Sequence, residues 1–381
     1  MRQRKDFYPL PTRRSCLVLL ASALAGCGGG DLIAAGPPGT GGTGIYAQGS
    51  ISGFGSVIIN GIRFDDSAAT VRLDDIALSS TDLRLGMVAS VQGQRGADAT
   101  LGTASSIEVW SMAQGLVTQA LAGGFMVAGM AVQTDDATVF DGIAGAAGLT
   151  PGRRVTVWGL QAGADGARWS ATRVAITGDT HMVSTGIVTQ DGSQRFLNGL
   201  QLTGPGAAGM VVGQMARAQG TLLAAGNSLQ VDSHRMMGPD SSPALQGEAD
   251  IEGVVTALLS ATRFSLGNVE VDASGASFSP ATAKAALGAR LSVDGIWQGR
   301  VLKATKVELK DTRTPQTVQI EARIEQFTSL ANFVVRGQRC DASGATISQG
   351  TAADLAVGVK VKLKGSLVGD VLRVATLELS N

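Results

Sequence analysis

Few side chains of this 381-residue sequence are of the types that perform chemistry. It has two histidines, His181 and His234, and no Gly-x-Ser-x-Gly, Cys-x-x-Cys or His-x-x-x-His motif. A Ser/His/Asp triad or a metal centre needs such groups held close together. His234 takes a repeat position that elsewhere carries Val174, Val307 or Leu377, which predicts a partly buried strand residue, with a metal ligand as the alternative. We expect no enzyme activity, no metal site and no cofactor.

Two further patterns are expected to be structural. The acidic pairs Asp65-Asp66, Asp74-Asp75 and Asp135-Asp136 lack the spacing of a calcium loop and predict solvated turns. Residues 39–44 match Gly-x-Gly-x-x-Gly, but they follow Pro37-Pro38 rather than a strand. A phosphate site needs the following helix N-terminus, so this segment is predicted to be a linker.

Cys27 has the clearest predicted chemistry. Residues 1–26 combine a basic start, an apolar run and small residues before Cys27, which is typical of a secretory signal peptide. The tetrad Leu24-Ala25-Gly26-Cys27 resembles the bacterial lipobox, whose cysteine is acylated after the leader is cut. The resemblance implies that acylated Cys27 anchors the protein in a lipid bilayer, because two or more acyl chains hold stably. The alternative is an ordinary signal peptide beside an unmodified cysteine.

The export route stays open. Thr12-Arg13-Arg14-Ser15 resembles the twin-arginine motif, but Cys16 and Val18 depart from its usual residues, so the general secretory route is the alternative. Gly28, rather than aspartate, follows Cys27, which by analogy favours the outer membrane, on its periplasmic or surface face. Residues 27–44 are rich in Gly and Pro and predict a flexible tether.

The rest of the chain repeats one pattern five times: glycine, two residues, then apolar, any, apolar, any, glycine. Two apolar residues in alternation between glycines predict a half-buried strand with a turn at each end. The repeat unit is roughly 70 residues long, and turns such as Asn60-Gly61 predict hairpins within it. Near its end, the apolar alternation shifts by one residue, which predicts a bulge or a bend in a strand. The copies start at Gly86, Gly152, Gly213, Gly288 and Gly358 and close at Gly93, Gly159, Gly220, Gly295 and Gly365.

These units predict an all-β fold. Short strands with glycine at the corners protect both edges by closing into a small barrel. We therefore expect a tandem array of about five small barrels, similar to the oligonucleotide/oligosaccharide-binding (OB) type, after the signal peptide and tether. Cys340 falls on the inward phase of a strand and predicts a buried, inert thiol, with a reactive thiol as the alternative. The barrels are predicted to span residues 45–111, 112–180, 181–238, 249–311 and 318–381.

The lipobox, the tether and the glycine-bracketed units together look like bacterial lipoproteins built from the family called domain of unknown function 5666, which consists of small β-barrel repeats. The resemblance covers about residues 45–381. It implies a fold and a compartment, and it supplies no catalytic residues.

The barrel type raises the question of nucleic-acid binding, which needs a cationic groove and stacking aromatics. The chain after residue 26 carries four more acidic than basic side chains, and this balance argues against that function. The lysines of residues 360–364 are expected to blunt a strand edge or to face lipid headgroups. Trp158 lies on the outward phase of its strand. Trp158 and Trp297 predict either packing against an adjacent barrel or a platform for carbohydrate or a partner.

The sequence thus favours a non-catalytic cell-envelope lipoprotein that presents a barrel array to an envelope protein or a polysaccharide. The alternative function is a glycan- or small-ligand-binding module of the periplasm or cell surface.

Overall fold

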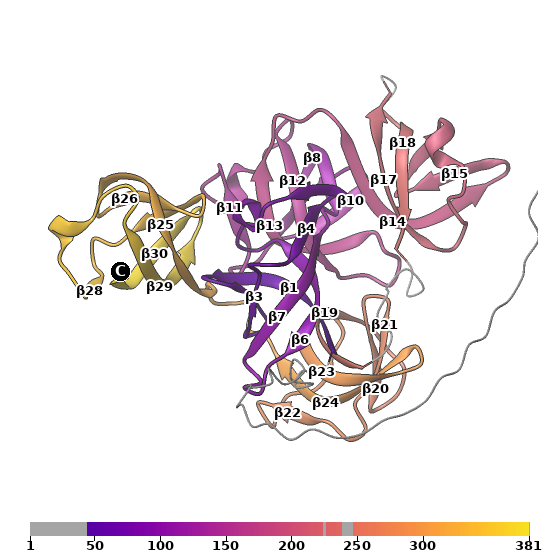
Figure 1. Ribbon diagram of the computed structural model, residues 1–381. Coiled ribbons are helices and arrows are strands. Elements are labelled where there is room, and N and C mark those ends of the chain that lie inside the picture. The colour runs from indigo at the N-terminus through magenta and orange to yellow at the C-terminus, as the bar shows by residue number, and fades with distance from the viewer. Residues whose placement is uncertain (1–43, 224–225, 238–246, 381) are drawn as a thin grey trace, which may run out of the picture. The chain divides into compact units, whose positions relative to one another are not determined.

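The computed structural model describes residues 44–223, 226–237 and 247–380, which form strands joined by tight turns (Figure 1). As predicted, these strands build small β-barrels in tandem. Short 3-10 turns occur at η1 (Ser80–Asp82), η2 (Ala146–Gly148), η3 (Pro205–Ala207) and η5 (Ala352–Asp354). No helix in the described ranges is long and apolar enough to cross a membrane.

The strands are grouped here by barrel. Barrel 1 contains β1 (Gly44–Phe54), β2 (Val57–Ile59), β3 (Ile62–Asp65), β4 (Thr70–Leu73), β5 (Ile76–Leu78), β6 (Val88–Arg95) and β7 (Leu101–Val109). Barrel 2 contains β8 (Ala113–Leu121), β9 (Gly124–Val127), β10 (Met130–Gln133), β11 (Val139–Asp141), β12 (Arg154–Gln161) and β13 (Arg168–Ile176). Barrel 3 contains β14 (Met182–Asp191), β15 (Gln194–Leu197), β16 (Leu200–Thr203), β17 (Met215–Leu222) and β18 (Ser228–Met236). Barrel 4 contains β19 (Glu248–Leu258), β20 (Arg263–Leu266), β21 (Val269–Asp272), β22 (Ser277–Ser279), β23 (Arg290–Gln298) and β24 (Val301–Leu309). Barrel 5 contains β25 (Thr317–Ser329), β26 (Asn332–Val335), β27 (Gln338–Asp341), β28 (Thr346–Ser348), β29 (Lys360–Val368) and β30 (Val371–Ser380).

Every barrel closes through the same circuit of pairings. In barrel 1, β1 pairs antiparallel with β2, and β2 pairs antiparallel with β3. Strand β3 runs parallel to β7, β7 pairs antiparallel with β6, and β6 returns antiparallel to β1. Barrels 2 to 5 repeat this order. The pairing of the first strand with the second-to-last strand closes each small barrel, as in the OB type.

The glycine bracket has a physical cause at each end. The opening glycine has a φ between 76° and 89° in all five copies, a left-handed conformation that glycine adopts without steric cost. Opposite the closing glycine, the last strand of each barrel bulges, and the register shifts by one residue. A Cβ on the closing glycine would lie closer than 3.0 Å to a carbonyl oxygen of that bulged strand. Between the glycines, all ten residues of the predicted apolar pairs are fully buried.

The barrels are also joined to one another by strand pairing. The first half of β1 runs parallel to β19 of barrel 4, in register from Ile45 with Glu248 to Gln48 with Ile251. The end of β1 pairs in parallel with β25 of barrel 5 at Gly53 and Phe54. In the other sheet, β14 of barrel 3 meets β8 of barrel 2 at Val183. Two continuous sheets therefore cross the barrel boundaries.

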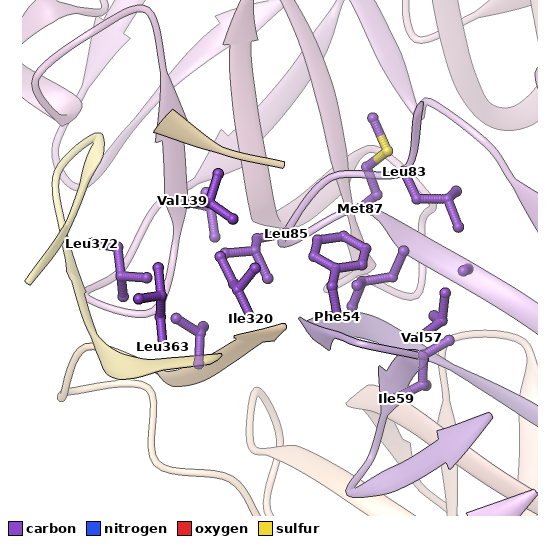
Figure 2. Close-up of a cluster of buried hydrophobic side chains, with 14 of the residues drawn as sticks. Phe54, Val57, Ile59, Leu83, Leu85, Met87, Val139, Ile320, Leu363 and Leu372 are labelled. Carbon is purple, nitrogen blue, oxygen red and sulfur yellow. The ribbon is translucent and has the colours of Figure 1, made fainter. Parts of the chain in front are cut away.

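The apolar cores follow this pairing. One cluster unites the cores of barrels 1 and 5 with Val139 and Trp158 of barrel 2. Figure 2 shows Leu85 and Phe54 of barrel 1 beside Val139 and Ile320, which come from barrels 2 and 5. A second cluster fills barrels 2 and 3, and a third fills barrel 4. Burial of these side chains, at roughly 25 cal/mol per Å² of apolar surface, stabilises both the barrels and their junctions.

Candidate functional site

The predicted lipobox residues Leu24, Ala25, Gly26 and Cys27 lie outside the described residues, as do the tether up to residue 43 and the signal peptide. The two predicted tryptophan positions are described. Trp158 and Trp297 are 6% and 8% exposed.

Trp158 is buried between barrels. Its side chain belongs to the apolar cluster that otherwise consists of barrel 1 and barrel 5 residues and Val139. The guanidinium carbon of Arg173 lies 5.9 Å from its ring centroid, within the range of a cation–π contact. The outward phase of its strand thus faces a neighbouring barrel rather than solvent.

The histidines and Cys340 are dispersed. His181 is exposed, and its Nδ1 lies 2.9 Å from Oδ1 of Asp179. The backbone amide of His181 lowers the pKa of Asp179 to about 2. His234 is half-buried, with Nδ1 2.7 Å from the carbonyl oxygen of Gly206. Cys340 is buried, and desolvation raises its pKa to about 12. In the described ranges, no group of three or more His, Cys, Asp or Glu side chains is placed to hold a metal.

Aromatic side chains gather at one cavity between the barrels. The cavity has a volume of about 200 Å³ and receives residues from barrels 1 to 4. Three of the four tryptophans in the sequence and one of its two tyrosines line this cavity. They are Tyr46, Trp110, Trp169 and Trp297, each at most 8% exposed. Most of the tryptophans therefore converge on one cavity, whereas none of the ten phenylalanines lines it.

Polar groups alternate with these rings on the cavity wall. The Tyr46 hydroxyl donates a hydrogen bond to Oε1 of Gln48 at 2.9 Å, and its oxygen lies 3.1 Å from the Ser90 hydroxyl, which can donate to it. The indole N–H of Trp169 donates to the carbonyl oxygen of Gly166 at 2.9 Å. The buried Nε1 of Trp297 has no hydrogen-bond partner among the described residues. Mostly apolar walls with a few placed polar groups are typical of small-molecule sites.

A buried ion pair borders the cavity where barrels 1 and 4 meet. Oε1 of Glu252 accepts a hydrogen bond of 2.7 Å from Nε of Arg290, and both side chains are at most 5% exposed. Oε2 of Glu252 accepts from the backbone amide of Ser50 at 2.7 Å and from its hydroxyl at 3.0 Å. Burial alone would raise the pKa of Glu252, but the Arg290 charge and the Ser50 amide outweigh it and hold this pKa below its ordinary value.

The pKa of Asp250, two residues earlier in β19, is shifted in the opposite direction. Its Oδ1 accepts hydrogen bonds from Nδ2 of Asn60 at 2.8 Å and from Oγ of Ser292 at 3.1 Å. Burial, reinforced by the negative charge of Asp294, raises the pKa of Asp250 to about 7. The junction of barrels 1 and 4 therefore contains a carboxyl that titrates near neutral pH.

Arginines clamp the other junctions of barrel 1. Arg217 of barrel 3 donates from Nε to the carbonyl oxygen of Ser111 at 2.7 Å and pairs with Asp74 of barrel 1 at 2.8 Å. Arg173 of barrel 2 donates to the carbonyl oxygen of Leu85 in barrel 1 at 2.9 Å. The planar, always charged guanidinium suits such buried contacts better than an ammonium.

Sequence reasoning missed the cavity and these junctions. Asp250 and Glu252 alternate with apolar residues in β19, a pattern that normally indicates a solvent-facing side. Here that side faces another barrel. The scarcity of aromatic residues was visible in the composition, but their convergence depends on how four barrels pack.

A family model described as a domain of unknown function (DUF5666) matches residues 48–108, 114–175, 252–308 and 321–377, more than half of the chain. The matches fall in barrels 1, 2, 4 and 5. Barrel 3 has the same circuit of strands although none of these four matches covers it. No curated protein matches the chain.

Proposed function

Because the chain belongs to the DUF5666 family and joins its repeats through buried polar contacts, we propose that it is a non-catalytic cell-envelope lipoprotein. Its joined barrels form a preassembled surface for a protein or polymer of the envelope. The acylated Cys27 anchors this surface to the membrane, with the outer membrane as the expected location.

The proposal rests on the buried charged side chains that join one barrel to another. Glu252 and Arg290 join barrel 4 to barrel 1, and Arg217 joins barrel 3 to barrel 1 through Asp74. Removing one partner of a buried pair costs about 3–5 kcal/mol. Such contacts hold neighbouring barrels in one arrangement, which supports recognition by surfaces that more than one barrel contributes.

The anchor is tested by incorporation of radiolabelled palmitate in cells, followed by membrane fractionation. We expect labelling of the wild type and loss of label and membrane association with Cys27→Ser. Cys16→Ser is the matched control, because it changes a cysteine of the predicted leader and should keep the label. An unlabelled wild type would overturn the anchor.

The interaction role is tested with a photo-crosslinking residue placed at Ile76, Leu287 or Val357. These side chains are 65%, 64% and 63% exposed and lie on barrels 1, 4 and 5. We expect a discrete crosslinked species in intact cells from at least one position. If all three variants give only uncrosslinked protein, a protein partner is contradicted and a polymer ligand is favoured.

The second candidate function, a glycan- or small-ligand-binding module, is favoured by one observation. That observation is the convergence of Tyr46, Trp110, Trp169 and Trp297 on the cavity between barrels 1 to 4.

A further inference from the structure

We propose that the cavity between barrels 1 to 4 binds a neutral saccharide, one sugar ring at a time. The inference rests on the second candidate function, for which it names a ligand class, and it is independent of the anchor at Cys27. Binding is tested on purified protein and the anchor in cells, so either can fail alone.

Aromatic side chains from three barrels form one part of the cavity wall. Tyr46 lies in β1 of barrel 1, and Trp110 directly follows β7 of the same barrel. Trp169 lies in β13 of barrel 2 and Trp297 in β23 of barrel 4. A sugar ring presents an apolar C–H face that packs on aromatic surface, while its hydroxyls seek hydrogen-bonding side chains. The cavity offers both kinds of group around one volume.

The indole N–H of Trp297 is a hydrogen-bond donor without a partner among the described residues. The Trp297 side chain is more than nine-tenths buried. Buried indole N–H groups usually have a partner. Because Trp297 lines the cavity, we assign a hydroxyl of the bound ligand as the partner of this donor.

Polar side chains form another part of the cavity wall. Gln92, Gln161 and Ser106 are half-buried at the cavity, and they supply amide and hydroxyl groups that both donate and accept. Gln161 already donates to the carbonyl oxygen of Gly163 at 2.8 Å, so the Gln92 amide and the Ser106 hydroxyl are the groups that a neutral hydroxyl-bearing ligand would engage.

Charge and size restrict the ligand further. Glu108 lies 3.6 Å from Arg235 in an ion pair, and Glu252 pairs with Arg290. The charged residues that line the cavity are two carboxylates, Glu108 and Glu252, and two guanidiniums, Arg235 and Arg300, so the wall is balanced in charge and a neutral ligand is favoured over an ionic one. The volume of about 200 Å³ is below the roughly 300–1,000 Å³ of pockets for drug-sized ligands, which limits the occupant to about one ring.

The test is a titration of intrinsic tryptophan fluorescence, since three of the four tryptophans line the cavity. The probes are methyl glucoside, methyl galactoside and N-acetylglucosamine, from about 1 mM to about 100 mM. Cyclohexanol, a ring of similar size with a single hydroxyl, is the control ligand. We expect a saturable change with at least one saccharide and none with cyclohexanol.

Variants locate the binding. Ser106→Leu fills the cavity from β7 and should weaken binding by about tenfold or more. Thr103→Leu, at an exposed position of the same strand, is the matched control and should bind as the wild type does. Gln92→Ala, which removes an amide from the wall without adding volume, should also weaken binding and covers the case in which Ser106→Leu does not fold.

Three results would overturn the inference. They are no saturable response to any of the saccharides, saturation by cyclohexanol alone, or equal affinity in the wild type, Gln92→Ala and Ser106→Leu.

Discussion

The backbone amide of Ser50 in β1 donates a hydrogen bond of 2.7 Å to Oε2 of Glu252 in β19, a carboxylate 202 residues later in the chain. Arg290 neutralises the same carboxylate from the other side. A main-chain donor cannot be removed by exchanging a side chain, so Ser50→Ala would remove only the hydroxyl contacts with Glu252 and Arg290 and would keep this bond. The stability of the junction depends instead on the charge balance between Glu252 and Arg290.

Arg290→Met should destabilise the protein by about 3–5 kcal/mol, because it leaves the buried Glu252 carboxylate without its countercharge. The measurement is the midpoint of urea unfolding, compared at an unchanged slope. Lys360→Met is the matched control at the equivalent position of barrel 5. There Lys360 pairs with Glu321 at 2.7 Å, but both side chains are partly exposed, and the cost should be about 0–1 kcal/mol. Equal midpoints for the two variants would show that Arg290 does not hold the junction.

Asp250→Asn should change how stability depends on pH. The pKa of Asp250 is raised to about 7, so the folded protein binds this proton more tightly than the unfolded chain. The resulting stabilisation is full below about pH 4, the ordinary aspartate pKa, and is lost as pH rises through about 7. Wild-type stability should therefore fall between pH 5 and pH 7.5 relative to that of Asp250→Asn, measured by urea unfolding at each pH.

Asp98→Asn is the control for this pH series. Hydrogen bonds from Thr100 lower the pKa of the Asp98 carboxyl, so its linkage lies at more acidic pH. Its curve should run parallel to that of the wild type from pH 5 to pH 7.5. If the curves of stability against pH run parallel for the wild type and Asp250→Asn, the pKa of Asp250 is not raised.

Gly295→Ala should lower stability by about 1–3 kcal/mol, because a Cβ there would lie 2.5 Å from the carbonyl oxygen of Lys303. Gly275→Ala, in a loop of the same barrel with nothing within 4 Å of its added Cβ, should be close to neutral. Thermal unfolding of both variants decides the point. If the Gly295→Ala protein is as stable as the Gly275→Ala protein, the backbone of the β24 bulge can move away from the added Cβ without a measurable loss of stability.

Cys340 should not react with a thiol reagent in the folded protein. Its side chain is 1% exposed, and burial raises its pKa to about 12, so little thiolate forms at pH 8. In a chain carrying Cys16→Ser and Cys27→Ser, colour from Ellman's reagent should appear only after urea is added. Rapid labelling without urea would assign Cys340 to a reactive class.

The local rules of the fold could be predicted, and the contacts between barrels could not. Alternation between glycines predicted the buried faces of β6, β12, β17, β23 and β29, because a strand core depends on near neighbours. The shift in the closing alternation likewise predicted the bulges. In contrast, the outward phase of a strand shows only that its own barrel does not cover it.

Burial of Arg290 was missed, and for Trp158 the sequence left packing against an adjacent barrel and a binding platform as alternatives. Both lie on the outward phase of a bracketed strand, and both are buried because another barrel covers them. Their sister positions carry Lys364 and Lys360, residues typical of a solvent-facing side. Only the packing of barrels distinguishes these cases, and the cavity has the same origin because four barrels contribute its wall.

The parallel pairing of β1 with β19 and β25 has a consequence for the order in which the protein folds. Barrel 1 lies earliest in the chain among the barrels, yet the strands that cover β1 are about 200 and 270 residues further along. Contacts over such separations form slowly, because the loop must close before they contribute. Until those strands are made, part of β1 has an uncovered edge, which is open to unwanted pairing. A folding helper would have its greatest effect on this first barrel.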